Sequence, residues 1–383
     1  MTRIFFEESI PRGEAYFSAL GDATSFNGPS LTAEQLTNVD YLAVRSTTAV
    51  NEALLAKADK LKLVTTATAG TNHLDKSALD AAGIPWRSAG GCNAVAVAEY
   101  VVSVLMNAYR SKQLNLSRIT VGIVGAGHVG TALAERLHAL NIAYKLCDPP
   151  LQQAGDHRHF VGMDEIMECD VITLHVPFVK AGEHATGHLL NAERIAGLTS
   201  AQLLINACRG EVVDEAALLQ RLQQPEPPTV VLDVFFGEPD INQALLPFLW
   251  LATPHIAGHS VEGKLRGTQM AYEHICEALE VSTSLTMDDF LAVPEAMPFT
   301  PADRTAEALD WDSLSALLLS IYDVSNDDRL FRQDTSKSGF LHMRKHYPVR
   351  RECGSHFLRI PAPVSEGIVE QLSGLGFQFN FVR

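Results

Sequence analysis

Three polar residues in the middle of the chain follow short apolar runs that are typical of buried parallel strands. They are Arg209, Glu238 and His255. The carboxyl ends of parallel strands lie at one edge of a sheet, so we expect these side chains to lie close together. Each residue alone is ordinary, because the chain has 14 histidines and most charged residues lie at the surface. Their shared position is what indicates a site.

Together the three side chains suit the transfer of a hydride from a 2-hydroxy acid. Arg209 can bind a carboxylate through its rigid, bidentate guanidinium. His255 can accept the hydroxyl proton near neutral pH as the hydride leaves. Glu238, hydrogen-bonded to the other ring nitrogen, would fix the tautomer of the imidazole and stabilise the imidazolium.

A glycine-rich turn earlier in the chain indicates a dinucleotide site. Residues 119–124 form a β-branched run, and Gly125, Gly127 and Gly130 follow it directly, before a helical pattern. Such glycines allow a tight turn, a close approach of backbone N–H groups to a pyrophosphate, and close helix packing. Asp148 ends the next apolar run, where a carboxylate binds ribose hydroxyls and repels a 2′-phosphate, which favours NAD over NADP. The alternative, a structural turn beside an ordinary exposed Asp148, explains the glycines alone.

Composition limits the classes of protein. With 46% hydrophobic and 20% charged residues, the chain is typical of a globular protein, and 383 residues predict two or three domains. A net charge of −15 argues against binding to nucleic acid or to an anionic membrane, so an anionic substrate needs local cations. Six cysteines without a C-x-x-C pair suggest neither a zinc site nor a disulfide framework. We expect a cytoplasmic protein without a metal.

The order of apolar runs predicts an α/β fold with a discontinuous first domain. Strand and helix patterns alternate over residues 1–96 and again over 97–254, and long helical patterns over 95–111 and 261–281 connect the two parts. We therefore expect a doubly wound Rossmann NAD-binding domain (97–254) inserted in a flavodoxin-like α/β substrate domain (1–96 and 255–285).

The last hundred residues predict a further small module. Pro294, Pro298 and Pro301 mark a linker. A helical pattern over 312–322, a polar loop near 326–338, a basic patch at 344–351 and a strand–helix–strand ending from 356 follow it. We expect residues 286–383 to form an α+β dimerisation module.

Two turns in the first domain are candidates for binding a substrate. The strand at 41–44 runs into Arg45 and Ser46, and the strand at 63–67 runs into Thr68. Ligands gather at the carboxyl ends of strands in open α/β sheets, although ordinary turn and cap chemistry also accounts for Ser and Thr at such places.

The chain resembles the D-isomer-specific 2-hydroxyacid dehydrogenases over roughly residues 1–285. The resemblance rests on the segments VGIVGAGHVG, INACRGEVVDEAAL, LDVFFGEP and TPHIAG. It implies that Arg209, Glu238 and His255 are the catalytic set, with His255 as the acid–base, and that NAD is the cofactor. Ser46 and Thr68 match substrate-contacting positions. His259 stands where the family pattern leads us to expect a substrate-contacting tyrosine.

The cofactor-contacting positions come from the glycine turn and from the family pattern together. They are Gly125, Gly127, His128, Val129, Gly130, Asp148, Val176, Ala207, Cys208, Arg209, Asp233 and Gly258.

The chain also resembles, within this family, the members that act on a particular phosphorylated acid, and this resemblance rests on the segments TATAGTNHLD, GCNAVAVAEYV, LCDPP and the terminal YPVRRE. This resemblance implies oxidation of 4-phospho-D-erythronate to 2-oxo-3-hydroxy-4-phosphobutanoate, a step of vitamin B6 biosynthesis. The additional C-terminal module leads us to expect a homodimer. We hypothesise that Arg45 and either Arg350 or Arg351 neutralise the substrate phosphate. A solvated run of charge explains the same arginines equally well.

Two alternatives remain open at this point. A 3-phosphoglycerate dehydrogenase, or another D-2-hydroxyacid dehydrogenase, would share the catalytic set. A nucleotide-sensing corepressor-like protein would use the same fold to control the binding of a partner, and the presence of all three catalytic side chains does not exclude that role.

Overall fold

The computed structural model describes residues 2–293 and 296–382, so the predicted linker residue Pro294 lies outside the described residues. The chain divides into two compact units. The first comprises the described residues of Met1–Asn93 and Ser260–Val293, and the second those of Ala94–His259 and Pro294–Arg383. Both units are built on parallel sheets covered by helices, which confirms the predicted α/β class.

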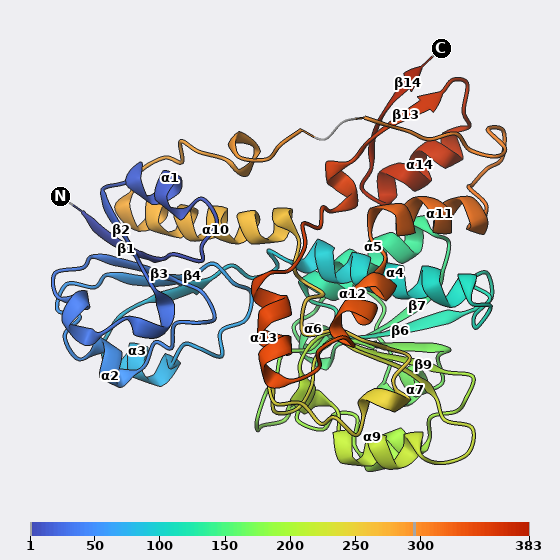
Figure 1. Cartoon of the computed structure of the whole chain (residues 1–383), viewed down its shortest axis with the longest axis horizontal. Helices are drawn as coiled ribbons and strands as arrows, with labels where there is room; N and C mark the ends of the chain where they lie inside the picture. Colours follow the sequence, from blue (N-terminus) through green and yellow to red (C-terminus); the bar gives the residue numbers. More distant parts are fainter. Residues whose placement is uncertain (1, 294–295, 383) are drawn as a thin grey trace. The chain divides into compact units, whose positions relative to one another are not determined.

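The first unit contains a five-stranded parallel sheet in the order β2-β1-β3-β4-β5. Its strands are β1 (Arg3–Glu7), β2 (Asp22–Phe26), β3 (Tyr41–Val44), β4 (Leu63–Thr66) and β5 (Trp86–Ser88). Its helices are α1 (Gly13–Ser18), α2 (Glu52–Leu55), α3 (Lys76–Ala81) and α10 (Val261–Leu279). Helices α1 and α10 cover one face and α2 and α3 the other, each with its own apolar cluster (Figure 1). Both faces of β3 and β4 are buried, which explains their continuous apolar runs.

The second unit contains a six-stranded parallel sheet in the order β11-β10-β9-β8-β6-β7. Its strands are β6 (Thr120–Val124), β7 (Ala143–Cys147), β8 (Val171–Leu174), β9 (Leu203–Asn206), β10 (Thr229–Leu232) and β11 (Leu251–Ala252). Its helices are α4 (Ala94–Arg110), α5 (His128–Ala139), α6 (Pro149–Gln153), α7 (Met163–Met167), α8 (Ala192–Ala196) and α9 (Glu215–Leu222). Residues of α4 and α5 pack on one face and residues of α7, α8 and α9 on the other, so the sheet is doubly wound.

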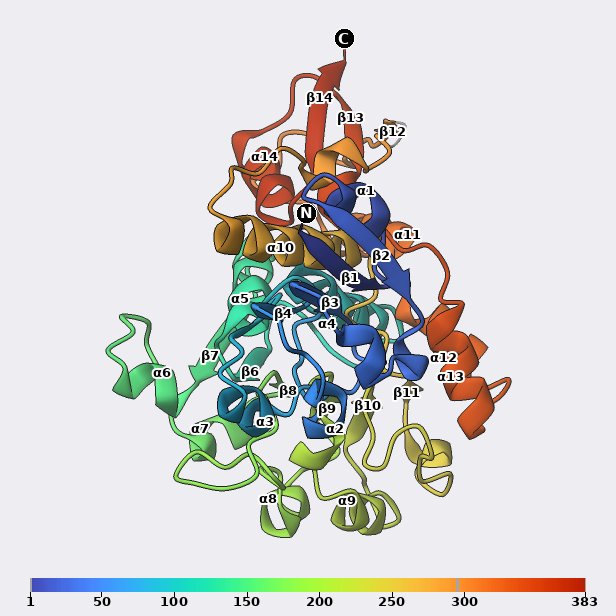
Figure 2. The same ribbon diagram turned by 90° about the vertical axis from the view of Figure 1, so that its left-hand side faces the viewer.

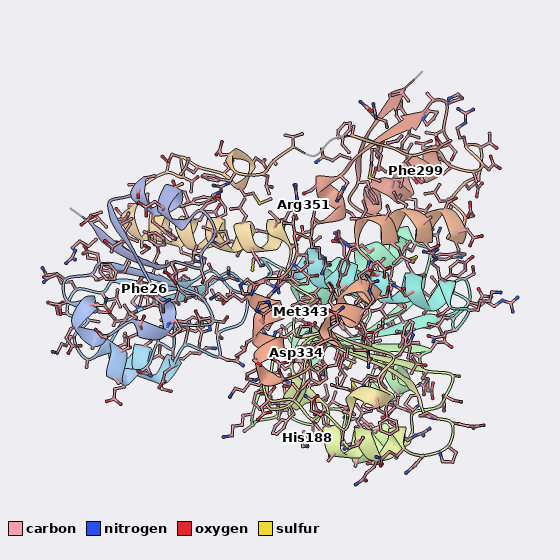
Figure 3. The ribbon with its side chains drawn as sticks, viewed as in Figure 1. Phe26, His188, Phe299, Asp334, Met343 and Arg351 are labelled. Carbon is pink, nitrogen blue, oxygen red and sulfur yellow. The ribbon has the colours of Figure 1, made fainter. Side chains whose placement is uncertain are left out.

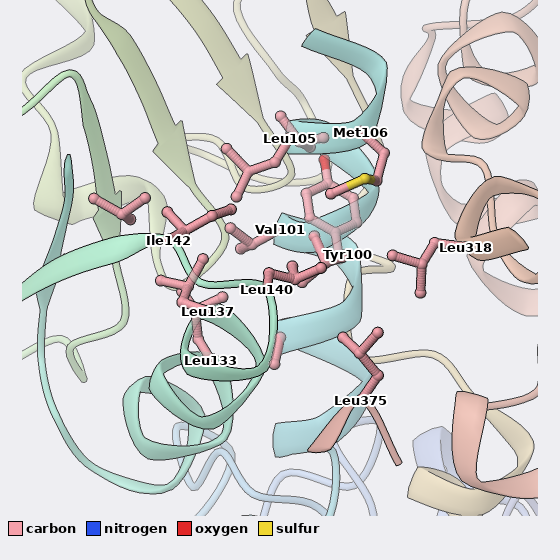
Figure 4. Packing of buried hydrophobic residues seen from close by; sticks show 14 of the residues in the cluster. Tyr100, Val101, Leu105, Met106, Leu133, Leu137, Leu140, Ile142, Leu318 and Leu375 are labelled. Atoms are coloured by element: carbon pink, nitrogen blue, oxygen red, sulfur yellow. The ribbon is translucent and has the colours of Figure 1, made fainter. Parts of the chain in front are cut away.

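The C-terminal residues of this unit form a small sheet with helices. A three-stranded parallel sheet has the order β12-β13-β14 (Figure 2). Its strands are β12 (Met297–Pro298), β13 (Phe357–Pro361) and β14 (Gln378–Val382), and the helices are α11 (Trp311–Ile321), α12 (Val324–Phe331), α13 (Lys337–Lys345) and α14 (Glu366–Gly374). This segment shares one apolar cluster with α4 and α5. Figure 4 shows Leu318 of α11 beside Tyr100 of α4, and Leu375 near the same helix further from Met106.

One sequence prediction in this segment is wrong. The polar composition of residues 326–338 predicts a loop, but α12 occupies its first half and α13 begins before its end. Asp323 caps α12 by accepting a hydrogen bond from the Ser325 N–H, and Val324 and Phe331 are the apolar residues that it buries. Two apolar residues seven positions apart are too few to reveal a helix by periodicity.

Among the described residues, no helix is both long enough and apolar enough to cross a membrane.

Candidate active site

The predicted catalytic residues follow three strands that are neighbours in the second unit. Arg209 follows β9, Glu238 lies in the loop after β10, and His255 follows β11. The sheet order β11-β10-β9 and the parallel direction of these strands put all three residues after strand ends on the same edge of the sheet.

Glu238 and His255 are joined by a hydrogen bond. The Nδ1 atom of His255 lies 2.7 Å from Oε2 of Glu238, and the other carboxylate oxygen accepts a hydrogen bond of 2.8 Å from the Phe235 N–H. Burial raises the pKa of Glu238, but the hydrogen bond and charge of His255 and the Phe235 N–H lower this pKa further, so the net shift is downward. The carboxylate is therefore ionised at neutral pH and holds the Nδ1 side of the ring, which leaves Nε2 for proton transfer.

Asp233 holds the turn that presents His255. Its carboxylate accepts hydrogen bonds from the Thr253 hydroxyl and from the N–H groups of Ile256 and Ala257, at 2.7, 2.8 and 3.0 Å. His255 itself has a φ of 55°, a left-handed backbone conformation that residues other than glycine seldom adopt. Such a conformation persists only where its surroundings enforce it. The buried Asp233 supplies that enforcement, although sequence analysis assigned it only to the cofactor.

Arg209 is partly buried and leaves β9 in an ordered turn. The side-chain amide of Asn206 donates to the Arg209 carbonyl at 2.9 Å, and the Arg209 guanidinium donates to the Cys208 carbonyl at 2.6 Å. Cys208 is buried, and burial raises the pKa of its thiol to about 11, so this cysteine stays a neutral thiol.

The glycine turn after β6 has the features that a bound dinucleotide needs. Gly125 has a φ of 92°, and a Cβ there would lie 2.6 Å from the His175 carbonyl oxygen. A Cβ on Gly130 would lie 2.1 Å from the Gly125 carbonyl oxygen, so the helix can pack this closely only with glycine. Apart from Gly127 itself and its two neighbours in the chain, no described residue has an atom within 4 Å of the Cβ position of Gly127. No side chain caps α5, which begins at His128. Its first N–H groups are thus available to an anion.

Asp148 stands beside this turn. Its two carboxylate oxygens accept hydrogen bonds from the Ala126 N–H at 2.8 Å and the Leu151 N–H at 3.1 Å. These bonds fix the carboxylate at the end of β7 and leave its remaining lone pairs for ribose hydroxyls. The glycine turn and Asp148 therefore fit NAD.

The other predicted cofactor positions lie in the same unit. Val129 is the second residue of α5, and Val176 follows β8 and would meet a Cβ at Gly125. Ala207 and Gly258 are partly exposed in the turns after β9 and β11. Their predicted contacts with the cofactor stay predictions.

The predicted substrate turns lie in the first unit. Ser46 is exposed just after β3, and the buried carboxylate of Glu7 organises this loop. Glu7 accepts hydrogen bonds from the hydroxyls of Thr47 and Thr48, both at 2.6 Å, and from the Arg45 N–H at 2.8 Å. Burial raises the pKa of Glu7, but the hydrogen bonds of Ser9, Thr47, Thr48 and Arg45 lower it further, so the residue is ionised. Sequence analysis missed Glu7, because a single acidic residue at a strand end carries no motif.

Thr68 belongs to a hydrogen-bonded turn after β4. Its hydroxyl donates to the Gly70 carbonyl at 2.9 Å and lies 2.8 Å from the Thr66 hydroxyl, which also contacts the His73 ring at 2.9 Å. Burial lowers the pKa of His73 to about 4, so its ring is neutral at physiological pH. The Thr68 contact with substrate stays a prediction.

The structure gives Arg350 a role different from the predicted one. Arg350 is 5% exposed, and its guanidinium donates to the carbonyl oxygens of Ala257 and Ala96 and lies 3.5 Å above the Tyr322 ring. A guanidinium engaged in this way is not available to a substrate phosphate. Arg350 instead ties the turn after His255 to α4. Arg351 is partly exposed, and its predicted contact with phosphate stays a prediction.

His259 packs against a tyrosine from the C-terminal segment. Its ring meets the edge of the Tyr347 ring with centroids 5.5 Å apart. The Tyr347 hydroxyl donates to Asp327 at 2.6 Å, so this hydroxyl is already engaged. Where the family pattern has a tyrosine after HIAG, this chain therefore has the imidazole of His259, and the phenol ring of Tyr347 packs beside it.

Sequence analysis also missed Arg344 as an individual site residue. This side chain comes from α13, and its guanidinium lies 3.7 Å from Oε2 of Glu238. Burial lowers the pKa of Arg344, as does the nearby charge of Arg209, while Glu238 and Asp233 raise it. In the sequence, Arg344 is one of several basic residues at 344–351, and nothing in the sequence distinguishes it from the others as a site residue.

Comparisons with known proteins agree with this geometry. Residues 97–257 match the model of the D-isomer specific 2-hydroxyacid dehydrogenase NAD binding domain, and residues 297–376 match a domain of unknown function (DUF3410). The NAD-binding match contains the glycine turn, Asp148 and all three predicted catalytic residues.

Solved structures share the fold of most of the chain. A glyoxylate/hydroxypyruvate reductase of Sinorhizobium meliloti has a TM-score of 0.63 at 24% identity, covering 75% of this chain and 97% of its own. The NAD⁺-bound 3-phosphoglycerate dehydrogenase of Entamoeba histolytica has a TM-score of 0.62 at 21% identity, covering 74% and 98%. At these identities the likeness concerns the fold alone.

Full-length relatives identify the family. The erythronate-4-phosphate dehydrogenase of Pseudoalteromonas atlantica is 49% identical over 351 residues, which cover 91% of this chain and 93% of that protein. The enzyme of the same name from Tolumonas auensis is 45% identical over 379 residues, 99% of each chain. The chain therefore belongs to the erythronate-4-phosphate dehydrogenase family of NAD-dependent D-isomer-specific 2-hydroxyacid dehydrogenases.

Proposed function

We propose that this chain oxidises 4-phospho-D-erythronate at C2, with NAD as the oxidant, to 2-oxo-3-hydroxy-4-phosphobutanoate in vitamin B6 biosynthesis. The observation that carries the proposal is the Glu238–His255 pair, which follows strands on the same edge of the sheet as the open glycine turn. The name shared by the full-length relatives supports this choice of substrate.

The residues of the site divide the work of this reaction. Arg209 binds the substrate carboxylate and holds C2 in place. His255 takes the C2 hydroxyl proton on Nε2, and Glu238, held at 2.7 Å from Nδ1, stabilises the imidazolium that results. The nicotinamide of bound NAD supplies the acceptor for the hydride that leaves C2. The glycine turn and Asp148 hold the diphosphate and the adenosine ribose.

The charge of the substrate gives the cations of the chain a role. The substrate carries a carboxylate and a phosphate, whereas the chain has a net charge of −15, so binding needs positive side chains close to the substrate. We propose Arg45 and Arg351 as contacts of the phosphate, and Ser46, Thr68 and His259 as further substrate contacts.

A comparison of two phosphorylated acids tests the proposal. Purified protein is assayed for formation of reduced nicotinamide with 4-phospho-D-erythronate and with 3-phosphoglycerate, each with NAD and with NADP. We expect a kcat/KM at least about 100-fold higher for 4-phospho-D-erythronate, because a site shaped for specific hydroxyl groups rejects analogues that lack them. Preference for 3-phosphoglycerate would overturn the choice of substrate. Absence of turnover with either acid, together with NAD-dependent capture of a partner, would favour the corepressor-like alternative.

We also propose that the C-terminal segment joins two copies of the chain and that the enzyme works in the cytoplasm. Residues 297–376 match a separate domain model, and the C-terminal segment carries the exposed side chains Val349, within that range, and Phe381, beyond it, which support a contact surface. Light scattering of the purified chain should give twice the monomer mass, and a monomer at micromolar concentration would contradict the pairing. Fractionation of cells tests the location.

A further inference from the structure

The C-terminal segment delivers a charged side chain to the catalytic pair. Arg344 is the eighth residue of α13, and its Nη1 atom lies 3.7 Å from Oε2 of Glu238. The same oxygen lies 2.7 Å from Nδ1 of His255. One carboxylate oxygen is therefore shared by an imidazole and a guanidinium that come from segments about 90 residues apart in the chain.

Several contacts fix α13 in this place. Ser336 caps the helix by accepting a hydrogen bond from the Gly339 N–H at 3.1 Å. Phe340 is buried and its ring meets the Phe331 ring edge to face. Met343, labelled in Figure 3, packs against the apolar cluster that contains residues of α7, α8 and α9.

Thr335, two positions before the first residue of α13, is also held by hydrogen bonds. Gln243, in the loop that follows Glu238, exchanges two hydrogen bonds with Thr335: its amide donates to the Thr335 carbonyl at 2.8 Å, and the Thr335 hydroxyl donates to Gln243 at 2.7 Å. The loop that carries Glu238 and the helix that carries Arg344 are thus joined at a second point.

The charges around the catalytic pair come from five elements. Glu238 faces His255 from the loop after β10, and Asp233 faces it from the end of β10. Glu215 of α9 acts on Glu238 with a like charge. Arg209, after β9, and Arg344, in α13, carry the positive charges, and Arg344 is the one in ion-pair contact with Glu238.

We propose that Arg344 is a positioning residue that acts through Glu238 on His255, and so gives the C-terminal segment a part in the reaction. The inference rests on the proposed dehydrogenase function. Without Arg344, the full negative charge of Glu238 would act on the imidazole ring, and the imidazolium would persist to higher pH. With Arg344 in place, part of that charge is compensated, so a smaller negative charge acts on the ring that must accept the substrate proton. The guanidinium is also in ion-pair contact with the same Oε2 atom that faces the ring.

The pH profile of oxidation tests this inference. The variants are Arg344→Gln, which removes the charge, Arg344→Lys, which retains it, and Lys345→Gln, which removes a charge from the exposed neighbour on the same helix. In Arg344→Gln we expect the acidic limb of kcat/KM to move up by about half to one pH unit, so that activity at pH 6 falls about 3- to 10-fold more than at pH 9. Arg344→Lys should restore most of the profile, and Lys345→Gln should match the unchanged chain.

A second measurement does not depend on turnover. The imidazole of His255 is followed by NMR during a pH titration, with its signal assigned by its loss in His255→Asn. The midpoint should rise in Arg344→Gln and return toward the original value in Arg344→Lys. If the enzyme does not oxidise 4-phospho-D-erythronate, the proposed function fails, yet this titration still tests the action of Arg344 on His255.

Two results would overturn the inference. One is an unchanged acidic limb and an unchanged NMR midpoint in folded Arg344→Gln. The other is a rise in KM at every pH without movement of the limb, which would make Arg344 a direct substrate contact instead.

Discussion

The Oε2 atom of Glu238 lies 2.7 Å from the Nδ1 atom of His255, although the two residues come from loops after different strands. This distance fixes which ring nitrogen faces the carboxylate and which remains for the substrate. It also turns two charged residues that are ordinary in isolation into an acid–base pair with a defined direction of proton transfer.

Replacement of the carboxylate tests the pair directly. Glu238→Gln keeps the shape and the Phe235 contact but removes the charge that stabilises the imidazolium, so we expect kcat to fall by about 100-fold or more. The Kd for NAD should stay within about twofold, because Glu238 is not among the residues that we assign to the cofactor. The control is Glu193→Gln, which changes an exposed glutamate in α8 of the same unit. A kcat within threefold of the unchanged enzyme would contradict the role of Glu238.

The clamp formed by Asp233 should matter for stability and for activity. In Asp233→Asn, an amide NH2 group replaces one carboxylate oxygen and must face at least one of the groups that now donate hydrogen bonds to Asp233. We therefore expect the free energy of unfolding to fall by about 1–3 kcal/mol. The turn at His255 should also relax, which lowers kcat. Thermal melting and steady-state kinetics measure the two effects. Thr253→Ser, which keeps the hydroxyl that donates to Asp233, serves as the mild control. An Asp233→Asn variant with unchanged melting temperature and kcat would refute the clamp.

Asp148 should set the choice of dinucleotide. Asp148→Asn removes the negative charge that repels a 2′-phosphate, and its amide NH2 replaces one of the two oxygens that accept from the Ala126 and Leu151 N–H groups. We expect the KM for NAD to rise and the preference for NAD over NADP to fall about 10-fold or more, which corresponds to about 1.4 kcal/mol. Kinetics with both nucleotides measure this ratio. Asp164→Asn, at an exposed position in α7, is the matched control. An unchanged ratio in Asp148→Asn would mean that another residue selects the nucleotide.

The buried Glu99 should make stability depend on pH. Burial raises the pKa of Glu99 from its ordinary value of 4.5 to about 7, so the folded chain binds more protons than the unfolded chain between these two pH values. The contribution of Glu99 to the free energy of unfolding therefore falls as the pH rises from about 4.5 to 7. Glu99→Gln keeps an acceptor for the Cys353 N–H and should melt a few degrees higher than the unchanged chain at pH 8 but not at pH 5.

Melting curves from pH 5 to pH 8 provide this comparison. Glu370→Gln, at an exposed position in α14, should follow the unchanged chain at every pH. Parallel curves for Glu99→Gln and the unchanged chain would show that Glu99 does not carry the pH dependence.

The sequence predicts two kinds of element well. One kind has a clear pattern of apolar residues, and the other has a backbone conformation or contact that only glycine allows. The strands at β6 and β9 are continuous apolar runs because both of their faces are buried, and the glycine turn is recognisable because Gly125 and Gly130 meet backbone atoms too closely for a side chain. Catalytic residues after strand ends follow from sheet topology once the strands are known.

The features that sequence analysis missed depend on contacts between distant segments. Arg344 reaches Glu238 only because α13 docks on this unit, and Arg350 is buried only because α4 and Tyr322 enclose it. Both arginines stand in one basic patch, and local sequence does not distinguish the one at the catalytic pair from the one in the interior. Glu7 is similar, since its four donors become neighbours only in the folded first unit.

The most direct test of the whole account is single-turnover oxidation by His255→Asn. With 4-phospho-D-erythronate and NAD, we expect the rate of nicotinamide reduction to fall by about 10²- to 10⁴-fold, because asparagine cannot take the hydroxyl proton. NAD binding, followed by fluorescence titration, should remain within about twofold of the unchanged enzyme. A His255→Asn variant that binds NAD normally and reduces it at nearly the original rate would contradict the assignment of His255 as the base.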